Sequence, residues 1–169
     1  MKKLPYGISN YEELITDGYY YVDKTMYIEK LENLAEKRIL FLRPRKFGKT
    51  LFTSMIENYY DIKKVDEFEK LYKDTYIGKN PTKLKNSYHI LKGFKEKTTI
   101  AIGGFIAKYG LDFYINPEQT TEGLLSSLIE AFKIQKSNEK IYVIIDEYDH
   151  FANELLGFNT SQFKNLVSK

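Results

Sequence analysis

The sequence predicts an α/β fold with a mainly parallel sheet, because short apolar runs typical of strands alternate with amphipathic helical patterns along the chain. Two stretches carry this prediction. Residues 38–42 contain an apolar run just before the basic segment 43–50, and residues 141–145 form a second apolar run that ends in two carboxylates. Parallel strands place their carboxyl ends at one edge of a sheet, so we expect both stretches to meet there.

The basic segment after the first run ends in Gly48-Lys49-Thr50. These residues fill the last three places of the phosphate-binding pattern G-x-x-x-x-G-K-[ST], with Arg43 in the place of the first glycine. A helix is expected next, because the following apolar residues share one helical face. They are Leu51, Phe52, Met55, Ile56, Tyr59 and Tyr60. A loop between a strand and a helix favours phosphate binding; the alternative is a basic surface loop before an ordinary helix.

The chemistry of a phosphate site explains these residue types. The first turn of a helix offers unpaired amides and a partial positive charge to an anion. Gly48 lets the backbone approach the phosphates, Lys49 would contact the β- and γ-phosphates and contribute to catalysis, and the Thr50 hydroxyl would hold Mg²⁺. The predicted nucleotide-binding residues are Arg43, Arg45, Lys46, Phe47, Gly48, Lys49 and Thr50.

The second apolar run ends in Asp146 and Glu147. Asp146 would hold Mg²⁺ directly or through water, and Glu147 would orient and deprotonate the attacking water. The alternative is a strand that ends in a solvated acidic turn. Asp149 is either a further acidic group or the cap of a following turn, and we favour the cap.

At this point the chain resembles the bacterial and archaeal AAA-ATPase-like family, whose members often carry a C-terminal nuclease-like domain of the PD-(D/E)xK type. The resembling segments are residues 4–8, 20–25, 41–50 and 141–149. The resemblance makes Arg43 the family's own variant of the loop. It implies a P-loop NTPase-like three-layer sandwich over residues 1–169, with ATP and Mg²⁺ as cofactors. It also implies a nuclease-like domain or nucleic acid as partner.

Two departures from the relatives accompany this resemblance. They have a longer strand and loop after the segment that matches residues 88–92, and they continue with a polar sensor and arginine-bearing elements. We therefore expect the domain to be incomplete at its C-terminus.

Composition narrows the class of protein. Hydrophobic content of 43% and charged content of 29% suit a soluble globular domain. A net charge of +3 is too balanced to indicate nucleic-acid binding alone. Without cysteine there is no disulfide framework or thiolate metal site, and two histidines do not make a zinc site. No apolar run is long enough for a membrane span, so a cytoplasmic protein is the simplest inference.

Other segments show weaker patterns. Asn10 is expected to cap a short helix at residues 11–15, and residues 19–22 read as a strand. Asp23 or Thr25 would cap the next helix; we favour this role for Asp23 over one beside the nucleotide. Further expectations are an amphipathic helix marked by Val65, Phe68, Leu71 and Tyr72, and a strand at 87–91. A helix from Thr120 or Thr121 is expected to have Leu124, Leu125, Leu128, Ile129 and Phe132 on one side, and a last helix to begin at Asn159 or Thr160. Residues 94–108 are ambiguous because Gly103 and Gly104 disfavour a helix.

Three functions are compatible with these patterns. The first is an ATPase core, and the second is a nucleotide-binding switch or interaction module without turnover. The third, by family analogy, is the ATPase part of a nucleic-acid-processing nuclease-like protein. The sequence leaves open ATP against GTP, the partner and the oligomeric state.

Overall fold

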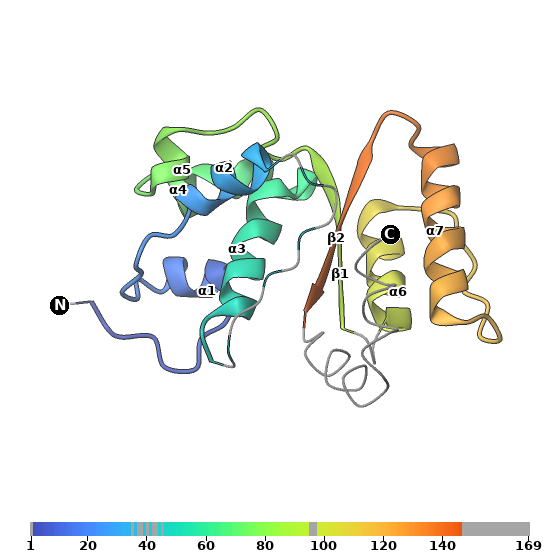
Figure 1. The fold of residues 1–169 in the computed structure, drawn as a ribbon, viewed down its shortest axis with the longest axis horizontal. Helices are drawn as coiled ribbons and strands as arrows, with labels where there is room; N and C mark the ends of the chain where they lie inside the picture. The colour runs from blue at the N-terminus through green and yellow to red at the C-terminus, as the bar shows by residue number, and fades with distance from the viewer. Residues whose placement is uncertain are drawn as a thin grey trace.

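The computed structural model describes residues 2–34, 36, 39, 41, 44, 46–94 and 98–146. Short helices dominate the first half, and the two strands follow later in the chain (Figure 1). The elements are α1 (Tyr11–Thr16), α2 (Met26–Asn33), α3 (Lys49–Tyr60), the 3₁₀ helix η1 (Ile62–Glu67), α4 (Phe68–Tyr72), α5 (Tyr76–Lys79), β1 (Tyr88–Phe94), α6 (Thr98–Tyr109), α7 (Thr121–Gln135) and β2 (Lys140–Asp146).

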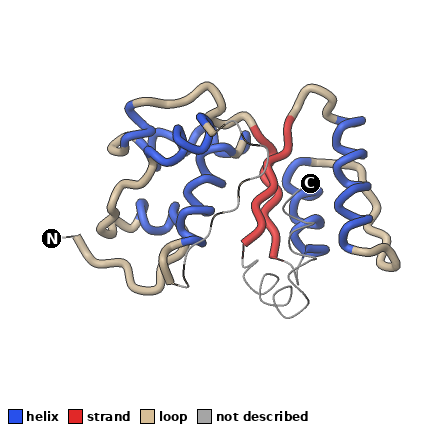
Figure 2. The backbone as a smooth tube through the Cα atoms, viewed as in Figure 1, coloured by secondary structure: helices blue, strands red, loops and turns tan. Residues whose placement is uncertain are grey.

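Within the described residues the sheet has two strands, β1 and β2, which pair in parallel (Figure 2). The register runs from Tyr88 opposite Lys140 to Phe94 opposite Asp146. A parallel pair needs a crossover, and here α6 and α7 supply it. The carboxyl ends of both strands therefore lie at the same edge, and Asp146 stands there, as the sequence predicts.

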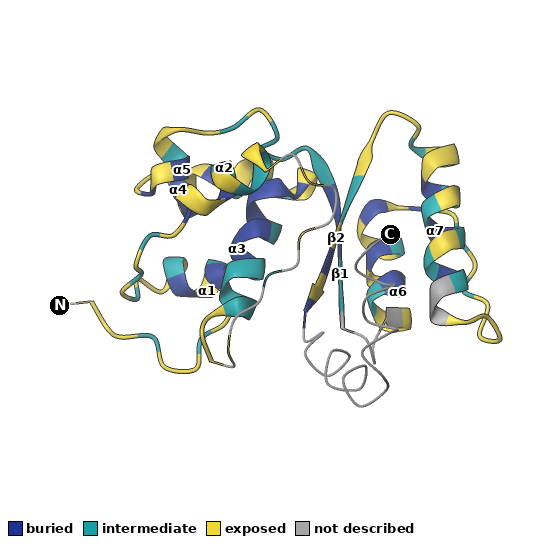
Figure 3. Ribbon diagram, viewed as in Figure 1, coloured by how far each residue is buried: buried dark blue, intermediate teal, exposed yellow. Residues whose placement is uncertain are grey.

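Helices lie on both sides of this sheet, with α1 to α5 on one side and α6 and α7 on the other (Figure 1). Each side has its own core of buried residues (Figure 3). The alternation of side chains along β2 serves both cores: Tyr142 and Ile144 pack towards α3, whereas Ile141 packs towards α6 and α7. The fold is thus α/β with a small parallel sheet. The predicted strand at 38–42 falls largely outside the described residues, so the mainly parallel P-loop sandwich stays a prediction.

Helix α3 joins the first core to the sheet. It buries Met55, Ile56, Tyr59 and Tyr60, four of the six residues predicted to share its apolar face. Burial of each such side chain contributes roughly 1.5–3 kcal/mol, so packing rather than intrinsic propensity fixes this helix. The other two residues of the predicted face, Leu51 and Phe52, are partly buried against the same core.

In the N-terminal region, the structure confirms one predicted helix cap and contradicts one predicted strand. The Asn10 side chain accepts a hydrogen bond from the Glu13 amide at 3.2 Å and so caps α1, as predicted. The predicted strand at 19–22 is wrong, because these residues are irregular. Tyr21 instead packs its ring edge-on to Tyr11, with centroids 5.3 Å apart. Of the residues that suggest a strand, Tyr21 therefore packs against the helical core, whereas Tyr20 and Val22 are exposed.

Asp23 has a structural role. One carboxylate oxygen accepts hydrogen bonds from the Thr25 amide at 2.8 Å and the Thr25 hydroxyl at 2.7 Å. The other accepts one from the Tyr76 amide at 2.7 Å. Asp23 thus ties the start of α2 to the start of α5. The predicted side-chain cap of α2 by Asp23 or Thr25 is wrong, because Thr25 is the N-cap and α2 has no side-chain cap hydrogen bond.

Two further segments differ from their expectations. Val65 is exposed, because it lies on η1 rather than in one amphipathic helix with Phe68. Residues 98–109 form α6 despite Gly103 and Gly104, since burial of Ile102 and Phe105 in the second core outweighs the cost of two glycines. The predicted helix from Asn159 or Thr160 lies outside the described residues.

The two sides of the sheet are also joined by a buried carboxylate. Asp61 follows α3 and is fully buried. It pairs with the Lys108 ammonium and accepts a hydrogen bond from the Tyr109 hydroxyl at 2.9 Å, both from α6. Its other contact is the Lys63 amide at 2.9 Å, which starts η1. Burial raises the pKa of Tyr109, so its hydroxyl stays a donor to this carboxylate.

Candidate nucleotide site

The N-terminus of α3 is built by a left-handed backbone turn. Gly48 is the N-cap, with φ of 74°, and Lys46 two residues earlier has φ of 66°. Positive φ is easy for glycine but costly for lysine, so the chain holds Lys46 in a conformation that L side chains rarely adopt. The Phe52 amide then donates to the Gly48 carbonyl at 2.9 Å, which closes the first turn. The turn is placed where the sequence predicts a phosphate loop.

The side chains of this turn differ in exposure. Lys46, Phe47 and Gly48 are exposed, whereas Lys49 and Thr50 are partly buried. The first turn of α3 contains no acidic residue, so nothing in it opposes an approaching anion. Arg43 and Arg45 lie outside the described residues.

The acidic end of β2 lies against this same turn. Asp146 is the last residue of β2 and is 5% exposed. Its Oδ2 atom is 3.5 Å from the Thr53 hydroxyl, and that hydroxyl donates to the Thr50 carbonyl at 3.0 Å. The structure therefore brings together two segments that are 93 residues apart in sequence. Glu147, the predicted general base, lies outside the described residues.

The donor set at this junction fits a hard cation. The Thr50 hydroxyl and the Asp146 carboxylate carry oxygen atoms, the donor type that Mg²⁺ prefers; this ion takes one or two protein oxygens and completes its shell with water and phosphate. No cluster of three or more His, Cys, Asp or Glu side chains occurs among the described residues.

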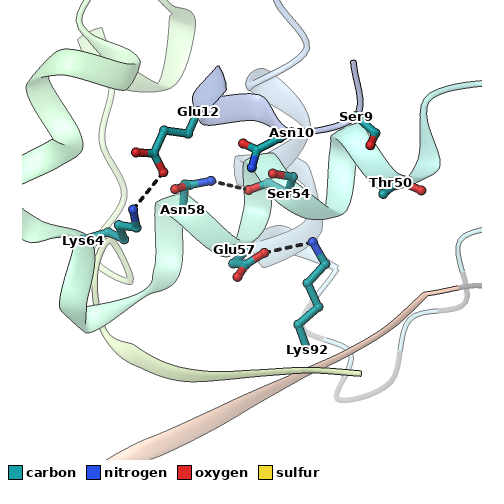
Figure 4. A pocket seen from close by; sticks show the side chains of 9 residues that line it. All are labelled: Ser9, Asn10, Glu12, Thr50, Ser54, Glu57, Asn58, Lys64 and Lys92. Carbon is teal, nitrogen blue, oxygen red and sulfur yellow. Dashed lines mark hydrogen bonds and ion pairs between the residues drawn. The ribbon is translucent and has the colours of Figure 1, made fainter. Parts of the chain in front are cut away.

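A polar cavity that was not predicted from the sequence lies beside the loop. It has a volume of about 310 Å³ and lies along one face of α3, below the N-terminal arm and α1 (Figure 4). Four of its residues recur at helical spacing on α3, which is the signal that could have revealed it. The lining residues are Ser9, Asn10, Glu12, Thr50, Ser54, Glu57, Asn58, Lys64 and Lys92.

Two ion pairs form the walls of this cavity (Figure 4). Lys64 contacts Glu12 at 2.8 Å, and Lys92 from β1 contacts Glu57 at 2.9 Å. The hydrogen bond from Lys64 lowers the pKa of Glu12. Burial lowers the pKa of Lys64, but its hydrogen bonds to Glu12 and Glu67 raise the pKa by more, so the net shift is upward. Lys64 thus pairs with two carboxylates, Glu12 and Glu67, and Lys92 with one. Thr50 is the residue that this cavity shares with the loop.

Comparison with known protein families gives a match that covers nearly the whole chain. Residues 5–168 match the AAA-ATPase-like family, described as predicted AAA-ATPase. The chain belongs to this family. Comparison of the AAA-ATPase-like chain with curated proteins and with solved structures gave no match.

Family membership supports ATPase-like nucleotide binding and ATP as the nucleotide. The match includes both the basic loop at 43–50 and the acidic end of β2. The resemblance seen in four short segments of the sequence therefore extends over nearly the whole chain. Among the described residues of this AAA-ATPase-like chain, no helix is long and apolar enough to cross a bilayer.

Proposed function

We propose that this domain binds Mg·ATP at the N-terminus of α3 and hydrolyses it. The observation that carries the proposal is the junction between the two predicted motifs. Thr53, in the first turn and a half of α3, lies 3.5 Å from Asp146 at the end of β2, although these two residues are 93 apart in sequence. A basic surface loop and an unrelated acidic turn would have no reason to meet at the carboxyl edge of a parallel sheet, where α/β folds bind ligands.

The residues would divide the work as follows. The amides at the start of α3 and the Lys49 ammonium would bind the β- and γ-phosphates. Thr50 and Asp146 would hold Mg²⁺, which supplies charge neutralisation to the phosphates when bound. Arg43, Arg45 and Lys46 would add positive potential, and Phe47, which follows Lys46 in the chain, is exposed. Glu147, directly after Asp146 in the chain, would orient the attacking water and accept its proton.

The binding part is tested with Lys49→Ala. Loss of the ammonium should weaken the binding of Mg·ATP by about 10-fold or more, which corresponds to about 1.4 kcal/mol of binding free energy. Calorimetric titration measures this affinity. Lys83→Ala is the matched control, because Lys83 is an exposed lysine whose neighbour Thr82 hydrogen-bonds to Tyr59, at the opposite end of α3 from the loop, and its loss should leave affinity unchanged. Equal affinity of wild type and Lys49→Ala would reject the proposal.

The hydrolytic part is tested with Glu147→Gln. Removal of the carboxylate should leave Mg·ATP binding intact and abolish phosphate release, because the amide cannot accept the proton of the water. Tight binding by the wild type without any phosphate release would instead favour a nucleotide-dependent switch over an ATPase.

A further inference from the structure

Thr53 connects α3 to the end of β2 through its side-chain hydroxyl. Its hydroxyl lies 3.0 Å from the Thr50 carbonyl and 3.5 Å from Asp146 Oδ2, and its side chain is partly buried. Thr53 is not part of the phosphate-binding pattern, and nothing in its sequence context indicates a role at the site.

The geometry limits what this hydroxyl can do. A threonine hydroxyl carries one proton and here faces two acceptors, so it can donate to only one at a time. The carbonyl of the preceding turn is the closer acceptor and holds the hydroxyl in place. A distance of 3.5 Å leaves the carboxylate at the outer limit of a hydrogen bond, so a small movement of either group decides whether the bond forms.

The branched side chain adds stiffness. Threonine has few χ1 rotamers in a helix, and its methyl group resists rotation away from the packed side. The position of the hydroxyl is therefore set by the backbone of α3, whose amides are the proposed phosphate site.

We propose that Thr53 is a positioning residue that orients the Asp146 carboxylate for the Mg²⁺ of a bound nucleotide. The inference rests on the proposed function. Hydrogen bonds to a metal-binding side chain fix its orientation, and their removal typically costs 10–100-fold in metal affinity. Thr53 would also couple phosphate binding at α3 to metal binding at β2, because one hydroxyl contacts both elements.

The experiment measures the Mg²⁺ concentration for half-maximal binding of a fluorescent ATP analogue. Thr53→Val keeps the shape but removes the hydroxyl, and should raise this midpoint about 10-fold. Thr53→Ser restores the hydroxyl and should bring it back close to the wild-type value. Thr16→Val is the matched control, because the Thr16 hydroxyl makes the same type of bond to a carbonyl three residues earlier, at 3.4 Å, but lies on α1.

The outcomes separate the two claims. An unchanged midpoint in Thr53→Val, or a raised midpoint that Thr53→Ser does not restore, would overturn the role of Thr53. If Thr53→Val does not fold, Thr53→Ala provides the same comparison with Thr53→Ser. Failure of the wild type to bind Mg·ATP, or equal binding by Lys49→Ala, would instead overturn the proposed function itself.

Discussion

His89 illustrates how one residue can set the pH response of this domain. It lies on β1, is 4% exposed, and packs its ring against Tyr109 and Phe132, with centroids 4.5 Å and 5.0 Å away. Its Nε2 atom is 2.8 Å from Glu139. Burial lowers the pKa of His89, and this effect outweighs the attraction of Glu139 for the charged form. The charged groups that act on His89 are Glu139, Lys136 and Asp61.

A lowered pKa in the folded state has a defined consequence. The unfolded chain binds a proton at His89 more readily than the folded chain, so the stabilising effect is complete above the unfolded pKa of about 6.5 and is lost as the pH falls below it. We expect His89→Gln to show a flatter loss of unfolding free energy between pH 7 and pH 5. The slopes of unfolding free energy against pH in the two proteins should differ by no more than about 1.4 kcal/mol per pH unit. Chemical denaturation at several pH values measures it, and parallel curves would contradict the assignment.

At the scale of elements, the structure depends on a contact across the sheet. Asp61 follows α3 and binds two side chains of α6, which belongs to the other core. A buried carboxylate is costly unless every oxygen is paired, and here both oxygens are. The contact therefore fixes how α3 and α6 sit relative to β1, and so the place of the proposed site.

Asp61→Asn tests this contact. Loss of the charge should lower the free energy of unfolding by about 1.5–3 kcal/mol, since bonds to a charged group are weakened. The side chain of Lys108 is 36% exposed, so solvation of its freed ammonium should keep the effect towards the lower end of this range. Urea denaturation gives the value, with Asp66→Asn on the exposed face of η1 as control. Equal loss in both variants would show that the charge at position 61 is unimportant.

Elements were predictable where local chemistry and packing agree. The Asn10 cap, the apolar face of α3 and the apolar run of β2 each combine a pattern with a position that the fold uses. The irregular conformation of residues 19–22 and the helical conformation of α6 were not predictable, because tertiary packing overrides local propensity in both segments. The turn of the phosphate loop followed from a motif, but Thr53 did not, since its partner Asp146 is distant in sequence and no local rule relates them.

At the scale of the molecule, nucleotide binding and folding are linked. Two cores meet on a sheet of two described strands, and the proposed site lies where α3 meets the end of β2. A ligand that holds both elements binds only the folded form. It should therefore stabilise the whole domain and not just the loop.

We expect a nonhydrolysable Mg·ATP analogue at 100 times its Kd to add about 2.7 kcal/mol to the unfolding free energy. For a chain of this size, that corresponds to a rise of roughly 5–11 °C in Tm. Lys49→Ala should show a clearly smaller rise at the same ligand concentration. Differential scanning calorimetry measures both, and an equal rise in the two proteins would indicate binding elsewhere.

The long separation between Thr53 and Asp146 has a consequence for biosynthesis. The helix that offers the amides is translated 93 residues before the carboxylate that it touches. During elongation the first core already has Tyr88 and Ile90 of β1 but lacks Tyr142 and Ile144, so its sheet-facing surface is only partly covered until β2 emerges. A nascent chain that stalls before this strand would expose that surface to chaperones and would have no nucleotide-binding capacity. Competence to bind ATP would thus appear abruptly, when β2 docks beside β1.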